Sequence, residues 1–169
     1  IQKGGSILHT SRSSRFANKK YRLVAEKNLR ALNVDGLVII GGEGSTKGAT
    51  ALSKISKTKC VVIPATIDKD MPLVGPTIGF DTAINTALSA IDKIRDTATT
   101  SNVTHIVEVM GRNCGWLGIL AGIGAGAEVT IIPEVKIDIA KLSKKIKSQL
   151  DRGKKGCIII LAEGGFSKG

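Results

Sequence analysis

The stretch Leu37-Val38-Ile39-Ile40-Gly41-Gly42-Glu43-Gly44-Ser45 predicts a buried strand that ends in a glycine-rich turn. The apolar run before the turn is typical of a strand in a covered parallel sheet. Residues 45–56, which follow, have a helix-like pattern. Glycines let a backbone approach a ligand closely, and the N–H groups at a helix N-terminus bind anions. The stretch therefore predicts a strand–turn–helix unit that is open to a phosphate group.

Glu43 stands inside this turn. A carboxylate repels a phosphate, so its presence is explained if a cation such as Mg²⁺ lies between Glu43 and a polyphosphate. The turn therefore indicates a nucleotide-phosphate site with a metal ion. The alternative is a tight strand-to-helix turn that binds nothing.

The overall composition favours a globular protein that binds small anions. The chain has 169 residues, 42% of them hydrophobic, which suffices for one medium domain or two small lobes. The net charge is +11, but only 3% of the residues are aromatic, so few side chains are present for stacking on bases. No apolar run approaches the ~20 residues of a membrane span. We therefore expect neither nucleic acid nor a membrane as a partner.

The N-terminus and the cysteines bear on the protein's context. The N-terminus has neither a signal-peptide apolar segment nor an initiator Met, so we expect an internal piece of a longer chain. Cys60, Cys114 and Cys157 are odd in number and have neither zinc nor disulfide spacing. We expect buried free thiols in a cytoplasmic protein.

Strand and helix patterns alternate along the chain. Strand-like runs rich in Val and Ile are expected at residues 35–40, 59–64, 104–110, 129–133 and 157–162. Helical patterns are expected at residues 19–33, 45–56, 80–97, 117–125 and 138–152, the last with Asp138 as its N-cap. The alternation predicts an α/β fold of two lobes, each a mainly parallel sheet flanked by helices. We expect residues 1–80 in one lobe and 81–169 in the other.

The chemically unusual segments all follow predicted strands. They are residues 41–45, 65–70, 111–115 and 163–165. Ligands of such folds bind beyond the carboxyl ends of the strands. We therefore expect these four segments to form one functional rim.

Pro64-Ala65-Thr66-Ile67-Asp68-Lys69-Asp70 contains two aspartates two residues apart. In an extended loop both side chains point the same way, and paired carboxylates raise one another's proton affinity. Such a carboxylate suits a general base, as phosphoryl transfer to a hydroxyl requires. The alternative is an Asp-rich turn without a catalytic role.

Two further charged residues follow later strands. Arg112 can bind a phosphate with two parallel hydrogen bonds, and Glu163 can accept hydrogen bonds from sugar hydroxyls. The alternatives are an exposed arginine and a solvated carboxylate at a strand end.

Six motifs together resemble the 6-phosphofructokinase family in order and spacing. They are GGEGSTKGA (41–49), PATIDKD (64–70), IGFDTA (78–83), IRDT (94–97), VEVMGRNCG (107–115) and AEVTIIPE (127–134). The resemblance covers essentially the whole chain and corresponds to about the middle half of a family member. It implies an ATP-dependent kinase of the bacterial type, in which residues 1–80 are part of the nucleotide-binding lobe and residues 81–169 part of the sugar-phosphate-binding lobe.

The resemblance also assigns roles in the catalytic centre. Asp68 matches the catalytic base, Asp70 the second aspartate of the catalytic loop, and Thr66 a residue that binds fructose 6-phosphate and the transferred phosphoryl group. The further sugar-phosphate contacts match Met110, Gly111, Arg112 and Glu163. The ATP site matches Arg12, Ser13, Gly42, Glu43, Gly44, Ser45 and Gly48. Glu43 stands where the family usually has a metal-linked Asp, which implies Mg²⁺ binding there.

The family's bacterial members have an allosteric site at a subunit interface. Its effector-binding positions match Arg95, Gly126, Glu128, Arg152, Lys154 and Lys155. The resemblance thus implies a homo-oligomer, a tetramer, that responds to an effector such as ADP or phosphoenolpyruvate. The cations suit effector phosphates, and the alternative from the residues alone is a set of charges at helix ends.

The chain departs from the family's pattern at several positions. An arginine that the family lends to a neighbouring subunit's sugar-phosphate site would fall at Val103, and Lys69 replaces the usual Asn between the two aspartates. Pyrophosphate-using relatives have an Asp in place of Gly44 and a Lys in place of Ala65, so the small residues here favour ATP as donor.

The function expected from the resemblance is transfer of the ATP γ-phosphoryl group to the 1-hydroxyl of fructose 6-phosphate, a step of glycolysis. Two alternatives stay open: a non-catalytic or regulatory kinase-like subunit that binds phosphorylated ligands, and a pyrophosphate-dependent relative.

Overall fold

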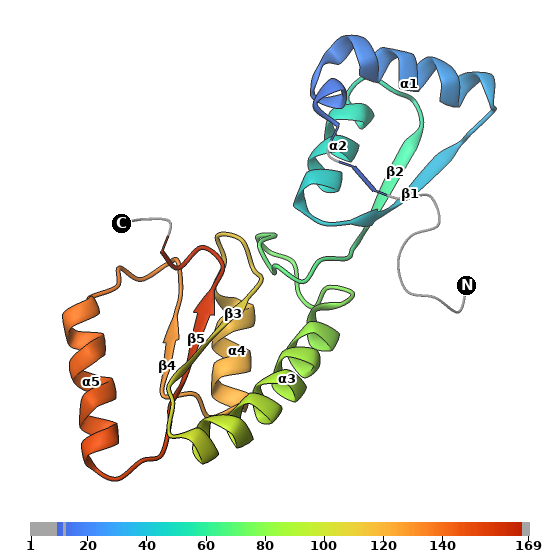
Figure 1. Cartoon of the computed structure of the whole chain (residues 1–169). Helices are drawn as coiled ribbons and strands as arrows, with labels where there is room; N and C mark the ends of the chain where they lie inside the picture. Colours follow the sequence, from blue (N-terminus) through green and yellow to red (C-terminus); the bar gives the residue numbers. More distant parts are fainter. Residues whose placement is uncertain (1–9, 12, 167–169) are drawn as a thin grey trace. The chain divides into compact units, whose positions relative to one another are not determined.

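The computed structural model describes residues 10, 11 and 13–166, and the chain divides into two compact units, Ile1–Ile63 and Pro64–Gly169 (Figure 1). The division differs from the 80/81 boundary expected from the sequence. The irregular segment 65–79 belongs to the second unit, where its Ile67 packs against the core that contains Phe80. The assignment of each lobe to a ligand stays a prediction.

The first unit contains a two-stranded sheet and three helical segments. In chain order these are η1 (Ser14–Ala17), α1 (Lys19–Ala31), β1 (Gly36–Gly41), α2 (Glu43–Ser53) and β2 (Lys59–Pro64). Asn18 caps α1 by accepting a hydrogen bond from the Lys20 N–H. Side chains of β1 alternate, since Leu37 and Ile39 are partly buried whereas Val38 and Ile40 are exposed. The apolar run thus forms a strand covered on one face within this unit.

The second unit contains a parallel three-stranded sheet in the order β3-β5-β4. Its elements are α3 (Phe80–Ser101), β3 (His105–Val109), α4 (Trp116–Gly124), β4 (Val129–Ile131), α5 (Ile139–Asp151) and β5 (Ile158–Ala162). The strand that comes last in the chain, β5, lies in the centre: Val109 pairs with Ala162 on one side, and Ile131 with Leu161 on the other. All three strands therefore end at the same edge.

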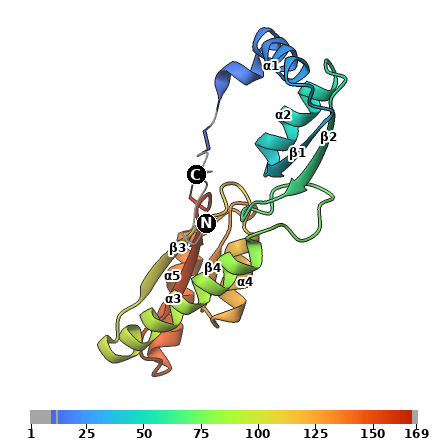
Figure 2. The ribbon, with the colours of Figure 1, turned by 90° about the vertical axis from the view of Figure 1, so that its right-hand side faces the viewer.

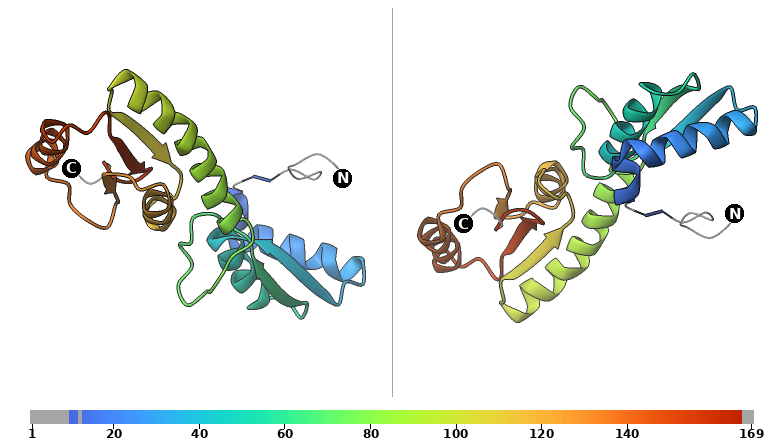
Figure 3. Two further views of the ribbon diagram at one scale, coloured as in Figure 1. Left: turned by 90° about the horizontal axis from the view of Figure 1, so that it is seen from below. Right: turned by 90° about the horizontal axis from the view of Figure 1, so that it is seen from above.

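Helices cover this sheet on both sides. Figures 1, 2 and 3 show α3 and α4 on one side, and α5 lies on the other. The core lies between α3, α4 and the sheet, where Ile91, Ala121 and Ile160 are fully buried. The amphipathic α5 has no fully buried residue and is capped by Asp138, whose side chain accepts from the Lys141 N–H. The core thus anchors β3 and β5, whose ends carry the site.

The α/β class and its parallel arrangement are confirmed, and most bounds lie within a few residues of those expected. Two helices differ. Helix α2 begins at Glu43, ahead of the expected residue 45, and α3 continues to Ser101. The extension of α3 buries Ala98 and ends where Asn102 adopts a left-handed conformation, with φ of 55°. Among the described residues, none of the helices combines the length and apolar content that crossing a bilayer requires.

Candidate active site

The glycine-rich turn lies in the first unit, between β1 and α2. Gly42 is the N-cap of α2, and its carbonyl accepts hydrogen bonds from the Thr46 N–H and the Thr46 hydroxyl, both at 3.1 Å. Gly41 is required by close packing, because a Cβ there would lie 2.5 Å from Ser45 Oγ. The glycine-rich segment therefore leads directly into the N-terminus of α2, and N–H groups at a helix N-terminus bind anions.

Glu43 is the first residue of α2 and pairs with Lys47 across one helical turn, at 2.6 Å. A carboxylate at a helix N-terminus is favoured by the helix dipole. Glu43 was expected in a turn before the helix, but α2 starts earlier, so Glu43 has a structural reason to be acidic besides a metal ion. Its side chain is 38% exposed, so it remains accessible to one.

The other positions matched to an ATP site also lie in the first unit, except that Arg12 is outside the described residues. A Cβ at Gly44 would meet no atom of the described residues within 4 Å, which leaves open space beside it in this part of the chain. Gly48 faces Phe16, whose ring lies 3.5 Å from the place of a Cβ. Ser13 is exposed and is the N-cap of η1.

The aspartate loop begins the second unit. The Thr66 hydroxyl accepts a hydrogen bond from the Asp68 N–H at 3.2 Å, and the Thr66 carbonyl accepts one from the buried Thr77 hydroxyl at 2.6 Å. Lys69 has a φ of 51°, in the left-handed region. The loop turns here and is not extended, so the alternation that was expected to point Asp68 and Asp70 the same way does not apply.

Asp70 connects this loop to Arg112. Arg112 Nη1 lies 3.8 Å from Asp70 Oδ2. The other oxygen, Oδ1, is buried and has no hydrogen-bond partner among the described residues. A buried oxygen without a partner is uncommon in folded proteins and is a position that a ligand hydroxyl or a cation can satisfy.

The loop after β3 is held by the ends of the other two strands. The Arg112 N–H donates to Glu163 Oε2 at 2.8 Å, after β5, and the Gly115 N–H donates to Glu134 Oε1 at 2.8 Å, after β4. Gly111 has a φ of 141° and Arg112 one of 53°. The backbone is thus strained at Arg112, and the hydrogen bond to Glu163 holds it in this conformation. Such strain is common in binding loops.

Three of the four segments expected in one rim therefore meet at the carboxyl edge of the three-stranded sheet. They are residues 65–70, 111–115 and 163–165, and they bring together Asp70, Arg112 and Glu163. Met110 directly follows β3 and has an exposed side chain, whereas Gly111 is buried. The segment 41–45 belongs to the first unit, and its place in the same rim stays a prediction.

The sequence interpretation missed two residues that support these loops. Thr77 holds the Thr66 carbonyl, and Glu134 holds the Gly115 N–H. Glu134 had a signal, since it follows a strand as Glu163 does. Thr77 had none, because its role depends on how the loop 65–79 closes.

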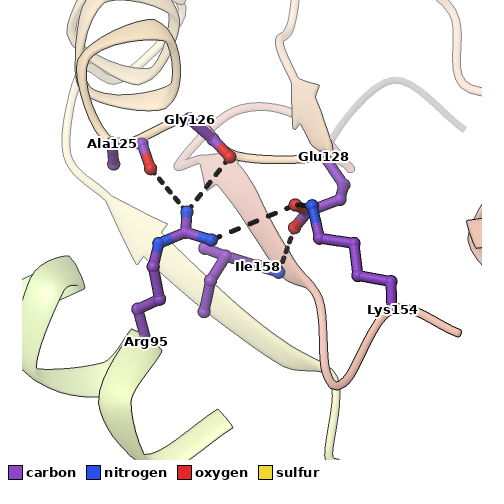
Figure 4. Close-up of polar contacts among 6 residues, drawn as sticks. All are labelled: Arg95, Ala125, Gly126, Glu128, Lys154 and Ile158. Atoms are coloured by element: carbon purple, nitrogen blue, oxygen red, sulfur yellow. Dashed lines mark hydrogen bonds and ion pairs between the residues drawn. The ribbon is translucent and has the colours of Figure 1, made fainter. Parts of the chain in front are cut away.

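Four of the six residues matched to an effector site form one cluster (Figure 4). Glu128 Oε2 accepts from the Ile158 N–H at 2.6 Å, and Oε1 pairs with Lys154 and, at 4.0 Å, with Arg95. Arg95 also donates to the carbonyls of Ala125, at 2.5 Å, and Gly126, at 3.1 Å. Arg152, the C-cap of α5, and Lys155 have exposed side chains.

The Glu128 carboxylate is buried, with 3% of its side chain exposed. Burial by itself raises the pKa of Glu128, but the hydrogen bonds from Lys154 and the Ile158 N–H outweigh it, so its pKa lies below the usual value. Burial, followed by the charge of Glu128, raises the pKa of the neighbouring Cys157 thiol. The cluster is therefore a satisfied ion-pair network in its own right.

Within the described residues, no group of three or more His, Cys, Asp or Glu side chains is arranged to hold a metal ion. Mg²⁺ in kinase sites is bound by one or two carboxylates together with substrate phosphates. Within the first unit, the accessible carboxylate of Glu43 is a ligand of the kind that such a site uses.

Comparisons with known proteins agree with these features. The Phosphofructokinase family matches residues 1–169. The ATP-dependent 6-phosphofructokinase of Staphylococcus carnosus is 48% identical over 165 residues, which cover 97% of this chain and 51% of that protein. That of Caldanaerobacter subterraneus is 49% identical over 167 residues, 99% of this chain and 52% of that protein.

The solved structure of Pichia pastoris phosphofructokinase in the T-state has a TM-score of 0.85 and 33% identity, over 96% of this chain and 20% of that chain. The chain spans about half the length of the curated relatives it matches. Because the family match covers the whole sequence, the chain belongs to the phosphofructokinase family.

Proposed function

We propose that the protein transfers the γ-phosphoryl group of ATP to the 1-hydroxyl of fructose 6-phosphate, giving fructose 1,6-bisphosphate and ADP. The relatives named ATP-dependent 6-phosphofructokinase support this, at 48–49% identity over nearly the whole chain. The observation that carries the proposal is the meeting of the aspartate loop with Arg112 and Glu163 at one sheet edge. Phosphoryl transfer to a hydroxyl needs a base and a phosphate-binding cation, and the loop that carries the proposed base Asp68 contacts Arg112 through Asp70.

In this mechanism the 1-hydroxyl oxygen attacks the γ-phosphorus, the bond to the ADP oxygen breaks, and the hydroxyl proton passes to the Asp68 carboxylate. Thr66 fixes the loop conformation through the Asp68 N–H, and Asp70 orients the Arg112 guanidinium. Arg112 binds the sugar phosphate, with Met110 and Gly111 beside it. Glu163 holds the Arg112 backbone and offers its exposed carboxylate to sugar hydroxyls.

The first unit supplies the nucleotide site in this proposal. The phosphates bind at the N-terminus of α2, along Gly42, Glu43, Gly44 and Ser45, with Arg12, Ser13 and Gly48 as further contacts. Glu43 would hold Mg²⁺, which supplies neutralisation of the charge on the transferring phosphoryl group.

The regulatory part of the proposal concerns Arg95, Gly126, Glu128, Arg152, Lys154 and Lys155. These residues bind a phosphorylated effector such as ADP or phosphoenolpyruvate in a cytoplasmic homotetramer. The exposed cations Arg152 and Lys155 are the accessible part of this set. Arg152→Gln should shift the effector concentration for half-maximal response and leave saturated turnover unchanged; an unchanged response would remove Arg152 from the site.

A coupled assay on the full-length protein tests the activity directly. Production of fructose 1,6-bisphosphate from fructose 6-phosphate and ATP supports the proposal. Binding of both ligands without turnover would instead indicate a non-catalytic subunit. The valine at position 103, where the family has an arginine for the sugar-phosphate site, favours this alternative.

The donor is tested by Gly44→Asp with pyrophosphate and ATP compared side by side. The open space at Gly44 accommodates the larger side chain, and an acidic residue suits a helix N-terminus, so the variant should fold. Its carboxylate should sharply lower the use of ATP because it repels the nucleotide phosphates. Wild-type activity with pyrophosphate that equals activity with ATP would make the protein a pyrophosphate-dependent relative.

A further inference from the structure

Lys69, between the two aspartates, has its ammonium against two aromatic rings. Lys69 Nζ lies 4.9 Å from the centre of the Phe80 ring and 5.1 Å from that of Trp116. Phe80 is the first residue of α3 and is buried, whereas Trp116 is the first residue of α4 and is 47% exposed. A cation within about 6 Å of a ring face is attracted by the ring quadrupole. The side chain therefore connects the aspartate loop to the starts of two helices.

The backbone of Lys69 is held by the same neighbourhood. Its carbonyl accepts a hydrogen bond from Cys114 Sγ at 3.4 Å, two residues before Trp116. Together with the Asp70–Arg112 pair, this gives three connections between residues 69–70 and residues 112–116. The two loops therefore have to adopt their positions together.

The conformation of Lys69 explains why such support is needed. A φ of 51° is uncommon for a residue with a side chain, and Asn adopts it more readily than Lys. A strained backbone persists only when its surroundings over-determine it. A lysine at this position is therefore less favourable for the left-handed conformation than an asparagine. The contacts of its side chain compensate for this local cost.

We propose that Lys69 is a positioning residue for phosphoryl transfer: its ammonium, held by Phe80 and Trp116, fixes the aspartate loop against the Arg112 loop. This rests on the proposed function, since it acts through Asp68 and Asp70. Lys69 serves as a cationic anchor whose chemistry an arginine can reproduce and a neutral side chain cannot.

The kinetic test uses the full-length protein with Lys69→Gln, Lys69→Arg, Trp116→Leu and the double variant Lys69→Gln/Trp116→Leu. Lys69→Gln should lower kcat by about 5- to 30-fold, the range of a cation–π attraction expressed as a rate, with KM for ATP unchanged. Lys69→Arg should stay within about 2-fold of wild type, because a guanidinium is also attracted by the faces of aromatic rings. The double variant should lose no more than the worse single variant. Lys144→Gln, which removes an exposed lysine on α5, is the control and should be unchanged.

A second measurement tests the anchor without activity. Trp116 is the only tryptophan of this sequence, so the difference spectrum between a variant and Trp116→Leu isolates its fluorescence. Lys69→Gln should change that emission, and Lys69→Arg should restore it. Unchanged emission in Lys69→Gln would overturn the anchor even if turnover falls. A changed emission with unchanged kcat would overturn the positioning role. An inactive wild type with the expected emission changes would overturn the proposed function, and with it the positioning role, while the anchor stands.

Discussion

Two carboxylates of the second unit, Glu128 and Asp70, sit in opposite situations. Glu128 is 3% exposed, and its oxygens are bonded to a backbone N–H and to two cations. Asp70 is 20% exposed, has one oxygen 3.8 Å from Arg112, and has its other oxygen buried without a partner among the described residues. On sequence alone, Glu128 was matched to an effector site and Asp70 to the catalytic loop.

The difference separates a carboxylate that its own chain satisfies from one that its chain leaves incompletely bonded. A buried polar group without a partner costs free energy, so an oxygen in that situation is a candidate for contact with a ligand. Glu128 has all it needs from its own chain and stabilises the connection between α3, β4 and β5. Asp70 and its loop carry the strained, incompletely bonded residues that are typical of sites.

The largest effect is expected at Asp68, in the aspartate loop. Asp68→Ser should lower turnover of the full-length enzyme by about 10²–10⁴-fold, because the general base is lost. Binding of fructose 6-phosphate, measured by calorimetry, should change much less. Glu128→Gln is the matched carboxylate control and should keep turnover; near-normal turnover of Asp68→Ser would show that the base is elsewhere.

The free energy of unfolding should fall more when Glu128 is replaced than when Asp70 in the aspartate loop is replaced. Glu128→Ala leaves the Ile158 N–H without its acceptor and should lower the free energy of unfolding by about 1–3 kcal/mol. Asp70→Asn removes only a long, partly exposed ion pair and should cost less than about 1 kcal/mol. Urea unfolding measures both, with the exposed Asp92→Ala on α3 as control. Equal losses would remove the distinction between the two carboxylates.

Cysteine reactivity should follow the same division. Cys157 is 1% exposed beside Glu128, and burial raises its pKa, whereas Cys114 in the site loop is only partly buried. A thiol reagent at neutral pH should label Cys157 at least about tenfold more slowly than Cys114, because Cys157 becomes accessible only when the structure opens locally. Peptide mass mapping over time measures both rates. Faster labelling of Cys157 would mean that the Glu128 region opens more readily than the site.

The smallest effect is a dependence of stability on pH. The pKa of Glu128 in the folded state lies below the usual 4.5. Around that pH, the folded state therefore binds fewer protons at Glu128 than the unfolded state does. Its contribution is fully present above about pH 4.5 and is lost as the pH falls through the folded pKa. The difference in unfolding free energy between wild type and Glu128→Gln should therefore be constant from pH 6 to 8 and shrink in acid. A difference that grows in acid would contradict the lowered pKa.

The sequence predicted the fold class and most element bounds because local pattern carries that information. Val and Ile runs gave the strands, and Asp138 was recognised as the cap of α5. The expected start of α2 was two residues too late, because Gly42 and Gly44 are typical of a turn. Glu43 nevertheless suits a helix N-terminus. Thr77 could not be assigned, since its partner depends on loop closure.

By itself the sequence determined the family, the parallel α/β architecture and which segments follow strands. These depend on periodicity and on short motifs, which are local. Only the tertiary structure decided that Glu128 is internally satisfied, that one Asp70 oxygen lacks a partner among the described residues and that Lys69 reaches two rings. Those facts depend on contacts between residues far apart in the chain, such as Lys69 with Trp116 and Glu128 with Ile158. No single segment encodes them, because hydrogen bonding and burial are fixed by which segments pack together.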